Sequence, residues 1–262
     1  MKKALLYVLI LTLAFCGCAA VPTAKNSAEV SDYSALSSTV QGWGMRKTDS
    51  RSEFTAEQID LCDTYKCIYM GAEKEKVMYL TFDEGYENGY TSVILDTLRE
   101  YGVPAAFFVT GAYVRSEPEL IARMAREGHT IGNHTVNHPC VAKLGEDELK
   151  NELGELDRLV YGICKKKCKY FRPPKGEYSE QSLARIKDMG YTTVFWSFAY
   201  VDWDNKVSRE EAFNSITKRF FPGSVLLLHA VSKGNAEALG DVIEAAQKEG
   251  YVFKSLDEYI AG

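Results

Sequence analysis

Two adjacent carboxylates, Asp83 and Glu84, stand at the end of an apolar run and directly before Gly85. The run, residues 77–82, has the β-branched and aromatic residues typical of a buried strand, and the ends of such strands are where parallel-sheet enzymes present chemistry. Two like charges side by side repel each other unless a cation, a proton or an arginine lies between them. The pair therefore indicates either a catalytic base beside a metal ligand or an ordinary solvated turn.

Two histidines four residues apart, His134 and His138, have a spacing that lets both imidazoles reach one metal ion from a tight loop. They lack the glutamate of the zinc-peptidase motif His-Glu-x-x-His, so peptidase chemistry is disfavoured. A carboxylate from another strand would complete a three-ligand site, and Glu84 or Asp83 is the obvious donor. Taken alone, such a histidine pair is more often incidental than a pair of metal ligands.

Three further segments carry groups that a hydrolytic site uses. Arg172 precedes the rigid Pro173 and could orient a carboxylate, although a surface arginine in a loop has the same pattern. Asp202 and Trp203 supply a carboxylate and a large apolar wall, and Trp203 could equally belong to the core. His229 ends an apolar run, where it could serve as an acid or as a buried structural histidine.

Strand and helix patterns alternate from residue 77 onward and must position these groups. Strands are predicted at residues 77–82, 105–110, 130–133, 170–172, 192–197, 224–228 and 251–253. Helices are predicted at residues 91–101, 118–127, 146–163, 179–189, 208–220 and 235–249, several of them followed by a glycine suited to a left-handed cap. Repeated strand–helix units imply an α/β fold with a parallel sheet. About seven units would close into a barrel, with an open doubly wound sheet as the alternative.

The candidate residues share one position relative to these strands. Asp83, His134, Arg172, Asp202 and His229 each follow a predicted strand. In both architectures the functional face lies at the carboxyl ends of the strands. The chain is therefore expected to gather its reactive side chains at one face.

Composition narrows the class of protein. The chain has 262 residues, a formal net charge of −5 and an apolar fraction of 46%, so it can bury one large core with a small appendage. It contains no long basic run, and the sequence gives no reason to expect a nucleic-acid partner. A neutral or cationic polymer is compatible with this charge.

The N-terminal region has the pattern of an exported protein. Residues 1–20 carry two lysines, a short apolar run and a cluster of small residues, in the order of a signal peptide or membrane anchor. Cys18 could be lipidated, the signal could stay uncleaved as an anchor, or it could be removed. Residues 21–41 are expected to be a linker, and residues 42–76, with a helix at 55–65, an extension packed on the main domain. The protein is expected to be a monomer in the cell envelope.

Five cysteines lie beyond the signal: Cys62, Cys67, Cys140, Cys164 and Cys168. In an oxidising compartment, Cys62 with Cys67 and Cys164 with Cys168 could each close a short disulfide loop, or all could stay free. Neither pair has the two-residue spacing of common zinc and redox motifs, so a cysteine metal site is disfavoured.

Five segments of the chain occur in the order of the motifs of a known family. They are Thr-Phe-Asp-Glu-Gly at 81–85, His-Thr-Val-Asn-His at 134–138, Arg-Pro-Pro at 172–174, Asp-Trp at 202–203 and Leu-Leu-His at 227–229. By these motifs residues 77–262 resemble the polysaccharide deacetylases, the NodB-homology enzymes of carbohydrate esterase family four. Segments at 86–91, 195–197, 201–203 and 235–239, and the stretch 43–70, resemble the subgroup of delta-lactam-biosynthetic peptidoglycan deacetylases, which act on muramic acid in the spore cortex.

The resemblance implies a distorted (β/α)7 barrel that removes N-acetyl groups from amino sugars of peptidoglycan glycan strands. It also implies one divalent metal ion, expected to be Zn, with Co, Mn or Mg as alternatives. By position, Asp83 would be the general base, His134 and His138 metal ligands, and His229 the general acid. Arg172 would orient the base.

The remaining motif positions include two departures from the family. By resemblance, Asp202 supports the catalytic histidine, Trp203 lines the acetyl pocket, and Pro173 belongs to the motif that presents the arginine. Glu84 replaces the usual metal-binding Asp, which the subgroup often replaces with Asn, and Ala199 stands where the fourth motif normally begins with Asp. Glu84 is one methylene longer than Asp, so the metal could shift, bind more weakly or be reached through water.

Two alternatives stay open at the level of sequence. An enzyme of the same fold could act on another N-acetylated or O-acetylated polysaccharide, such as N-acetylglucosamine in peptidoglycan, chitin or xylan. A catalytically weak envelope protein could instead bind glycan without turning it over. The residues at Glu84 and Ala199 motivate this second hypothesis.

Overall fold

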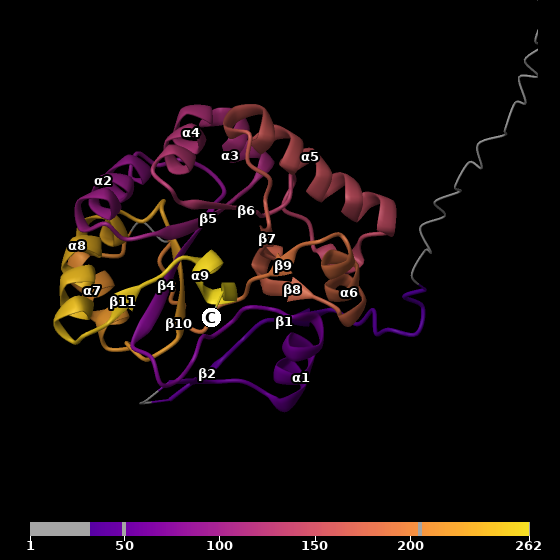
Figure 1. Ribbon diagram of the computed structural model, residues 1–262, viewed down its shortest axis with the longest axis horizontal. Helices are drawn as coiled ribbons and strands as arrows, with labels where there is room; N and C mark the ends of the chain where they lie inside the picture. Colours follow the sequence, from indigo (N-terminus) through magenta and orange to yellow (C-terminus); the bar gives the residue numbers. More distant parts are fainter. Residues whose placement is uncertain (1–31, 49–50, 204–205, 262) are drawn as a thin grey trace, which may run out of the picture. The chain divides into compact units, whose positions relative to one another are not determined.

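A curled parallel β-sheet forms the centre of the structure, which is a computed structural model (Figure 1). Its strands are β4 (Val77–Glu84), β5 (Ala105–Val109), β6 (Thr130–Asn133), β7 (Tyr170–Phe171), β9 (Thr192–Thr193), β10 (Ser224–His229) and β11 (Val252–Phe253). They pair in the order β10–β4–β5–β6–β7–β9, each pair is parallel, and β11 pairs with the start of β4. The predicted α/β class is confirmed, and the sheet contains the seven expected strands.

The structure describes residues 32–48, 51–203 and 206–261. The predicted signal peptide or anchor at residues 1–20, and the predicted linker up to residue 31, lie outside these described residues. Within the described ranges, no helix is both long enough and apolar enough to cross a membrane. From Tyr33 onward the described chain forms one compact unit.

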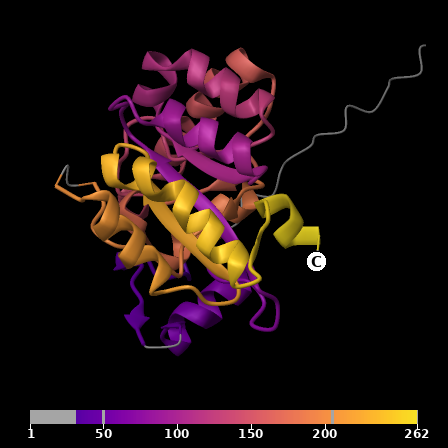
Figure 2. The same cartoon turned by 90° about the vertical axis from the view of Figure 1, so that its left-hand side faces the viewer.

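Most of the helices cover the outer face of the sheet, and α8 lies across β10 and β4 (Figure 1, Figure 2). The helices are α1 (Ala56–Tyr65), α2 (Thr91–Tyr101), α3 (Gly111–Ser116), α4 (Pro118–Arg126), α5 (Glu146–Cys164), α6 (Glu180–Asp188), α7 (Arg209–Thr217), α8 (Lys233–Lys248) and α9 (Leu256–Ala261), with 3-10 turns η1 (Val141–Lys143) and η2 (Pro174–Gly176). All seven predicted helices are present. The short helices α3 and α9 were not predicted, because each is too brief to show a helical period.

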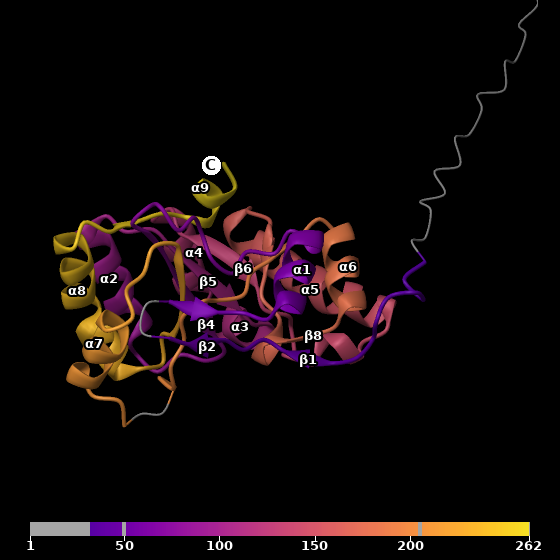
Figure 3. The same cartoon turned by 90° about the horizontal axis from the view of Figure 1, so that it is seen from below.

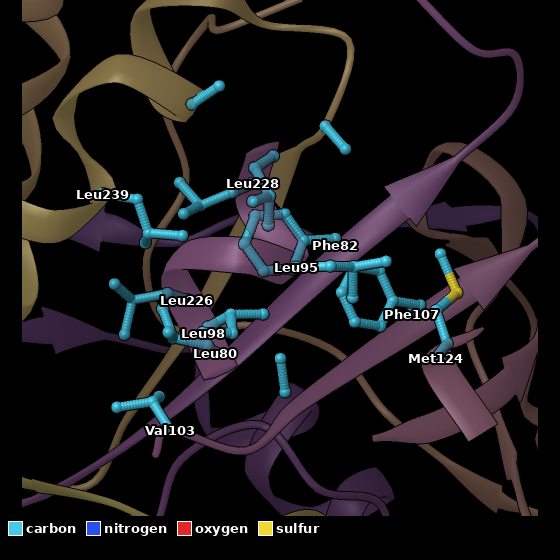
Figure 4. Packing of buried hydrophobic residues seen from close by; sticks show 14 of the residues in the cluster. Leu80, Phe82, Leu95, Leu98, Val103, Phe107, Met124, Leu226, Leu228 and Leu239 are labelled. Carbon is cyan, nitrogen blue, oxygen red and sulfur yellow. The ribbon is translucent and has the colours of Figure 1, made fainter. Parts of the chain in front are cut away.

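The main hydrophobic core lies between the outer face of the sheet and the helices (Figure 4). Phe82 of β4 and Phe107 of β5 stack with their ring centroids 5.2 Å apart. Leu95 and Leu98 of α2 and Leu239 of α8 are buried in the same cluster. Burial of each such side chain contributes about 1.5–3 kcal/mol, which holds the helices on the strands that carry the candidate site.

The residues of β4 alternate between the two faces of the sheet, as successive residues of a strand must. Leu80 and Phe82 lie in the outer core with the helices. Tyr79 lies on the inner face, in a separate cluster with Phe108 of β5. By the same alternation, the last two residues of β4 have side chains on opposite faces.

The sheet curls far enough for its two sides to meet through isolated backbone bridges. β9 covers the first two residues of the strand predicted at 192–197, so that strand is shorter than expected. The chain then leaves regular pairing, and Val194 bridges Ile68 from the N-terminal extension. Further along, Phe198 bridges Leu226 of β10. These bridges connect the two ends of the strand order, β9 and β10.

The N-terminal part of the described chain takes part in two small antiparallel sheets that are separate from the central sheet. They are β1 (Gln41–Gly42) with β8 (Glu177–Tyr178), and β2 (Arg46–Lys47) with β3 (Ser52–Glu53). Before them, the hydroxyl of Tyr33 donates to Asp188 at 2.9 Å, and the N–H of Gln181 donates to the carbonyl of Ser37 at 3.0 Å. The compact unit therefore begins at Tyr33 rather than at residue 42, and the last part of the predicted linker is packed against α6.

The five cysteines within the described residues are free thiols. The two short disulfide loops considered from the sequence are therefore absent from this part of the chain. Cys62 and Cys67 are both buried, and the N–H of Cys67 donates to the carbonyl of Cys62 at 2.9 Å. A hydrogen bond with Cys67, together with burial, raises the pKa of the Cys62 thiol. Cys62 is thus held as a neutral, hydrogen-bonded thiol.

Candidate active site

A pocket of about 380 Å³ lies at the carboxyl ends of the central strands, where the sequence predicted the functional face. Its lining comes from segments far apart in the chain. The lining residues are Asp83, His134, His138, Lys175, Gly176, Trp196, Trp203, Leu227 and His229. The fold therefore brings the predicted base, both predicted histidine ligands and the predicted acid to one cavity.

Asp83 is held at the pocket by a buried arginine. Nη1 of Arg172 donates to Oδ1 of Asp83 at 2.7 Å, and Arg172 has no solvent exposure. Burial alone would raise the pKa of Asp83, but the charge of Arg172 and the hydrogen bond from its guanidinium, together with the nearby His229, outweigh burial and hold that pKa below its usual value. Asp83 is therefore ionised at neutral pH and can accept a proton.

The guanidinium of Arg172 is fixed on every side. Its Nε donates to the carbonyl of Val194 at 3.1 Å, and Nη2 donates to the hydroxyl of Thr81 at 2.8 Å. The group stacks over the ring of Phe108, with 4.1 Å from Cζ to the ring centroid. A fork held in this way sets the orientation of the Asp83 carboxylate, as the sequence predicted for this residue.

His134 and His138 face each other across the loop after β6. Their ring centroids are 4.9 Å apart. Nδ1 of His134 lies 2.8 Å from the carbonyl oxygen of Arg172, so Nδ1 carries the proton and Nε2 keeps its lone pair. Burial lowers the pKa of both histidines, that of His134 to about 4. Both imidazoles are therefore neutral at pH 7, which is the form that binds metal.

Hydrogen bonds shape the loop that carries the two histidines. Thr135 and His138 have the positive backbone angles φ 67° and φ 58°. The side-chain oxygen of Asn133 accepts from the N–H of Thr135 at 2.9 Å, and the hydroxyl of Thr135 accepts from the N–H of His138 at 2.9 Å. Glu152 of α5 accepts from the two intervening N–H groups. These bonds stabilise a tight turn that brings residues four apart to the same side.

Glu84 does not join the two histidines, contrary to the predicted ligand set. It follows Asp83 on β4 and so points to the outer face, where it is fully buried near Glu87 and Tyr113. Neither carboxylate oxygen has a hydrogen-bond partner among the described residues. Burial and the negative charges of Glu87 and Asp83 raise the pKa of Glu84 well above its usual value. No group of three or more His, Cys, Asp or Glu side chains in the described chain is arranged to hold a metal.

His229 is supported from behind by a buried carboxylate. Oδ1 of Asp202 accepts from Nδ1 of His229 at 2.7 Å, and Oδ2 accepts from the backbone N–H of His229 at 2.8 Å. Burial lowers the pKa of His229, but the hydrogen bond and charge of Asp202 outweigh it, so the pKa lies above its usual value. The imidazole therefore retains a proton on Nε2 more readily than a free histidine does.

Asn235, at the start of α8, positions Asp202 and was not singled out as a site residue from the sequence. Its side-chain amide donates to Oδ2 of Asp202 at 2.6 Å and to the carbonyl of His229 at 3.2 Å. The signal that could have found it is the Ser-x-x-Asn pattern of a helix start, because Ser232 caps α8 through the N–H of Asn235. Asn235 thus joins the first turn of α8 to the acid side of the site.

The walls of the pocket include residues that were predicted and residues that were not. Trp203 lies edge-on to His229, with ring centroids 5.3 Å apart, and is 54% exposed, so it belongs to the pocket and not to the core. Pro173 does not line the pocket. It precedes η2, where positive backbone angles at Lys175 and Gly176 turn the chain into the cavity. No sequence pattern had indicated these two residues.

A parallel α/β fold that presents an arginine-held carboxylate and an aspartate-held histidine to one pocket has the groups that an enzyme of general acid–base chemistry needs. The model of the polysaccharide deacetylase family matches residues 70–194 of the chain. Taken with the relatives below, this places the chain in the polysaccharide deacetylase family, carbohydrate esterase family four.

Similar proteins include characterised peptidoglycan deacetylases. The chain is 43% identical over 246 residues, 92% of its length and 92% of the relative, to the peptidoglycan-N-acetylmuramic acid deacetylase PdaA of Bacillus subtilis. The solved structure of that protein superposes with a TM-score of 0.84 at 42% identity, covering 86% of this chain and 98% of the other. A peptidoglycan-N-acetylglucosamine deacetylase of Bacillus cereus is 33% identical over 214 residues, 80% of this chain and 77% of the relative.

Proposed function

We propose that this protein removes the N-acetyl group from N-acetylmuramic acid in peptidoglycan glycan strands. The observation that carries the proposal is that Asp83 and His229 line one pocket, each fixed by a buried partner of opposite charge. The similarity to a relative named as a muramic acid deacetylase supports this choice of sugar.

Amide hydrolysis needs a base that activates water, and Asp83 is suited to that role. Arg172 occupies Oδ1 of Asp83, whereas Oδ2 lies 3.6 Å from Nε2 of His134, on the pocket side. An ionised carboxylate so oriented takes a proton from a water placed beside the acetyl carbonyl. The same arginine prevents the carboxylate from turning away, so Asp83 removes the proton of the water from one fixed direction while the water oxygen attacks the acetyl carbonyl.

The departing sugar nitrogen needs a proton, and His229 is suited to supply it. Asp202 holds Nδ1, so Nε2 is the ring atom that can face the substrate. The raised pKa of His229 keeps the proton available at neutral pH, and transfer to nitrogen avoids the expulsion of an amide anion. Trp203, beside His229, offers an apolar wall for the acetyl methyl group.

His134 and His138 fit a divalent metal ion, and we propose that they hold one. Both imidazoles are neutral, and a backbone carbonyl fixes the tautomer of His134 so that Nε2 can donate its lone pair. Zn suits two imidazoles best, with Co, Mn and Mg as alternatives. When bound, the ion would supply Lewis-acid polarisation of the acetyl carbonyl. Glu84 is not included in this ligand set, because its carboxylate lies on the other face of the sheet.

The deacetylated product accounts for the choice of muramic acid as the substrate sugar. Deacetylation leaves a free amine near the lactyl carboxyl group of the same sugar, and joining these groups gives a delta-lactam. We propose that the protein acts on this route in the spore cortex, outside the cytoplasm, after export. The N-terminal pattern supports export with a membrane or lipid tether, and the monomeric state stays a prediction.

The test is to incubate the purified protein with cortex peptidoglycan and to analyse the fragments by mass spectrometry. We expect the loss of one acetyl group from muramic acid residues and the release of acetate. Asp83→Asn and His229→Ala should each abolish both signals while circular dichroism shows a folded protein. Near-normal turnover in either variant would remove that residue from the mechanism.

N-acetylglucosamine in the same strands is the second candidate substrate, since a relative named for that activity shares a third of its aligned residues. Digestion of vegetative peptidoglycan distinguishes the two, because acetyl loss from glucosamine and not from muramic acid would favour this candidate. O-acetylated polysaccharides are tested by acetate release from acetylated xylan. A glycan-binding protein without activity would bind the strands and release no acetate from any of these substrates.

A further inference from the structure

We propose that a second groove, next to the active-site pocket, binds the sugars of the glycan strand that lie beyond the sugar being deacetylated. This extension groove is formed by residues from 41–46 and 53–58 together with Tyr178, and it has a volume of about 490 Å³. The inference rests on the proposed function, because it names where the rest of the same polymer lies. No residue of the five motifs belongs to this groove.

One short stretch of chain, residues 175–178, contributes lining residues to both the active-site pocket and the extension groove. Lys175 and Gly176 line the pocket, and Tyr178, two residues later, lines the groove. Two residues of extended chain span about 7 Å. β1 joins the groove to this stretch, because Gly42 pairs with Glu177. In Figure 3, β1, β2 and β8 lie at the same edge of the structure as α3, which follows β5, whereas α9 lies at the opposite edge.

Trp43 forms the wall between the two cavities. Its backbone N–H donates to the carbonyl of Gly176 at 2.8 Å, and its indole Nε1 donates to the carbonyl of Trp196 at 2.8 Å. The indole also stacks on Phe195, with ring centroids 4.1 Å apart. The residues on either side of Trp43 line the groove, so this buried ring fixes one cavity relative to the other.

Gly176 allows this wall to close. Its φ is +69°, and an added Cβ would lie 2.7 Å from Trp196 and 3.1 Å from Trp43. A residue with a side chain would therefore separate Trp43 from Trp196 or distort the turn. The close contact of the pocket with the N-terminal extension thus depends on a glycine at residue 176, which lines the pocket.

The lining of the extension groove has the chemistry of a carbohydrate site. The amides of Gln41 and Gln58 offer both donors and acceptors, Arg46 adds donors and Glu53 adds acceptors, which suit hydroxyl and acetamide groups. Arg46 and Glu53 form an ion pair, so their two charges balance. Phe54 adds an aromatic face for the C–H side of a sugar ring.

Gly44 provides a direct steric test. It is exposed, its φ is not positive, and an added Cβ would meet no atom within 4 Å. Gly44→Phe therefore adds bulk in the groove without backbone strain. Gly162→Phe is the matched control, because Gly162 is an exposed glycine of α5 whose Cβ would also meet no atom within 4 Å.

The measurement compares kcat/KM for long peptidoglycan strands with kcat/KM for a short N-acetylated oligosaccharide. The unchanged full-length protein should prefer the long strands, and Gly44→Phe should reduce that preference about tenfold, mainly through KM. Gly162→Phe should keep it. Should Gly44→Phe fail to fold, Arg46→Ala at an exposed position should reduce the same preference. If the unchanged protein and the folded groove variant prefer long strands to the same degree, the proposal is overturned.

Two further arms separate this inference from the proposed function. If the unchanged protein releases no acetate, the proposed function fails, but the binding of long strands still tests the groove. Equal dissociation constants for unchanged protein and Gly44→Phe would then overturn the inference. If the effect of Gly44→Phe appears only with strands that carry peptide stems, the groove binds the peptide and not the sugars, which also overturns it.

Discussion

Arg172 and Asp83 are joined across the sheet by a hydrogen bond of 2.7 Å from Nη1 to Oδ1, and the arginine is completely buried. The two residues come from β4 and from the end of β7, so the bond connects two walls of the curl. The bond leaves the second carboxylate oxygen of Asp83, Oδ2, available to accept a proton. The orientation of the base is therefore a property of the whole sheet and not of one loop.

Arg172→Lys should lower kcat/KM about 10–100-fold, because an ammonium group cannot reproduce the planar fork. Activity is lost as pH falls through the pKa of Asp83, and Arg172 holds that pKa low. In the variant the pKa should rise, so the acidic limb of the pH profile should move to higher pH. Acetate release measured from pH 3 to pH 8 checks this. An acidic limb that stays in place would show that Arg172 does not control the ionisation of the base.

Asp202→Asn should move the alkaline limb of the pH profile of activity. An acid must be protonated, so activity falls as pH rises through the pKa of His229, which Asp202 raises. Loss of the carboxylate charge should lower that pKa and start the decline at lower pH, with kcat reduced about 10²–10⁴-fold. The ratio of kcat at pH 8 to kcat at pH 6 is the readout. A ratio equal to that of the unchanged protein would contradict an acid role for His229.

Glu84→Met should stabilise the protein at pH 8 by about 1–3 kcal/mol, because it replaces a buried carboxylate without partners by an apolar side chain of similar size. The folded-state pKa of Glu84 is raised, so the ionisation of Glu84 in the unfolded chain lowers stability as pH rises, and this part of the cost is absent at low pH, where both states are protonated. Urea unfolding should therefore show a gain that is larger at pH 8 than near pH 4.

Zinc titration gives the control for this variant. Glu84→Met should keep the zinc affinity, whereas His138→Ala should weaken it, because only the histidine belongs to the proposed ligand set. A clear loss of zinc affinity in Glu84→Met would return Glu84 to the metal site.

Gly132→Ala should destabilise the protein by about 1–3 kcal/mol, because the core has no room for a methyl group there. An added Cβ would lie 2.4 Å from the ring of Phe108, which supports the guanidinium of Arg172. Gly154→Ala is the control, since a Cβ at this helical position meets nothing within 4 Å and should stabilise slightly. Denaturant unfolding of both variants measures the difference, and equal midpoints would show that Phe108 moves without cost.

The fold was largely predictable from the sequence because its elements carry local signals. The helices have apolar stripes and caps, and Gly102 and Gly190 are in the left-handed region with φ of 65° and 89°. The isolated bridges of Ile68 and Phe198 were not predictable. Each depends on a partner far away in the chain, and such pairing leaves no periodic pattern.

The sequence predicted most residues of the candidate site, but it did not predict the direction of every side chain. Each motif residue follows a strand, so the topology alone brings Asp83 and His229 together. The direction of Glu84 was missed because β4 is apolar on both faces, and its alternation is therefore invisible in the sequence. Lys175 was missed because a positive φ of 58° at a residue other than glycine has no sequence signature.

The bridges of the N-terminal extension bear on how the chain folds as it is synthesised. Ile68 pairs with Val194, and Met70 pairs with Ser224, although both partners are made long after them. Long-range pairing of this kind slows folding, and the waiting backbone edges are open to other chains. A fragment that begins after Met70 would keep every motif residue. It would expose the backbone of Val194 and Ser224, which Ile68 and Met70 cover in the whole protein, and would be prone to self-association.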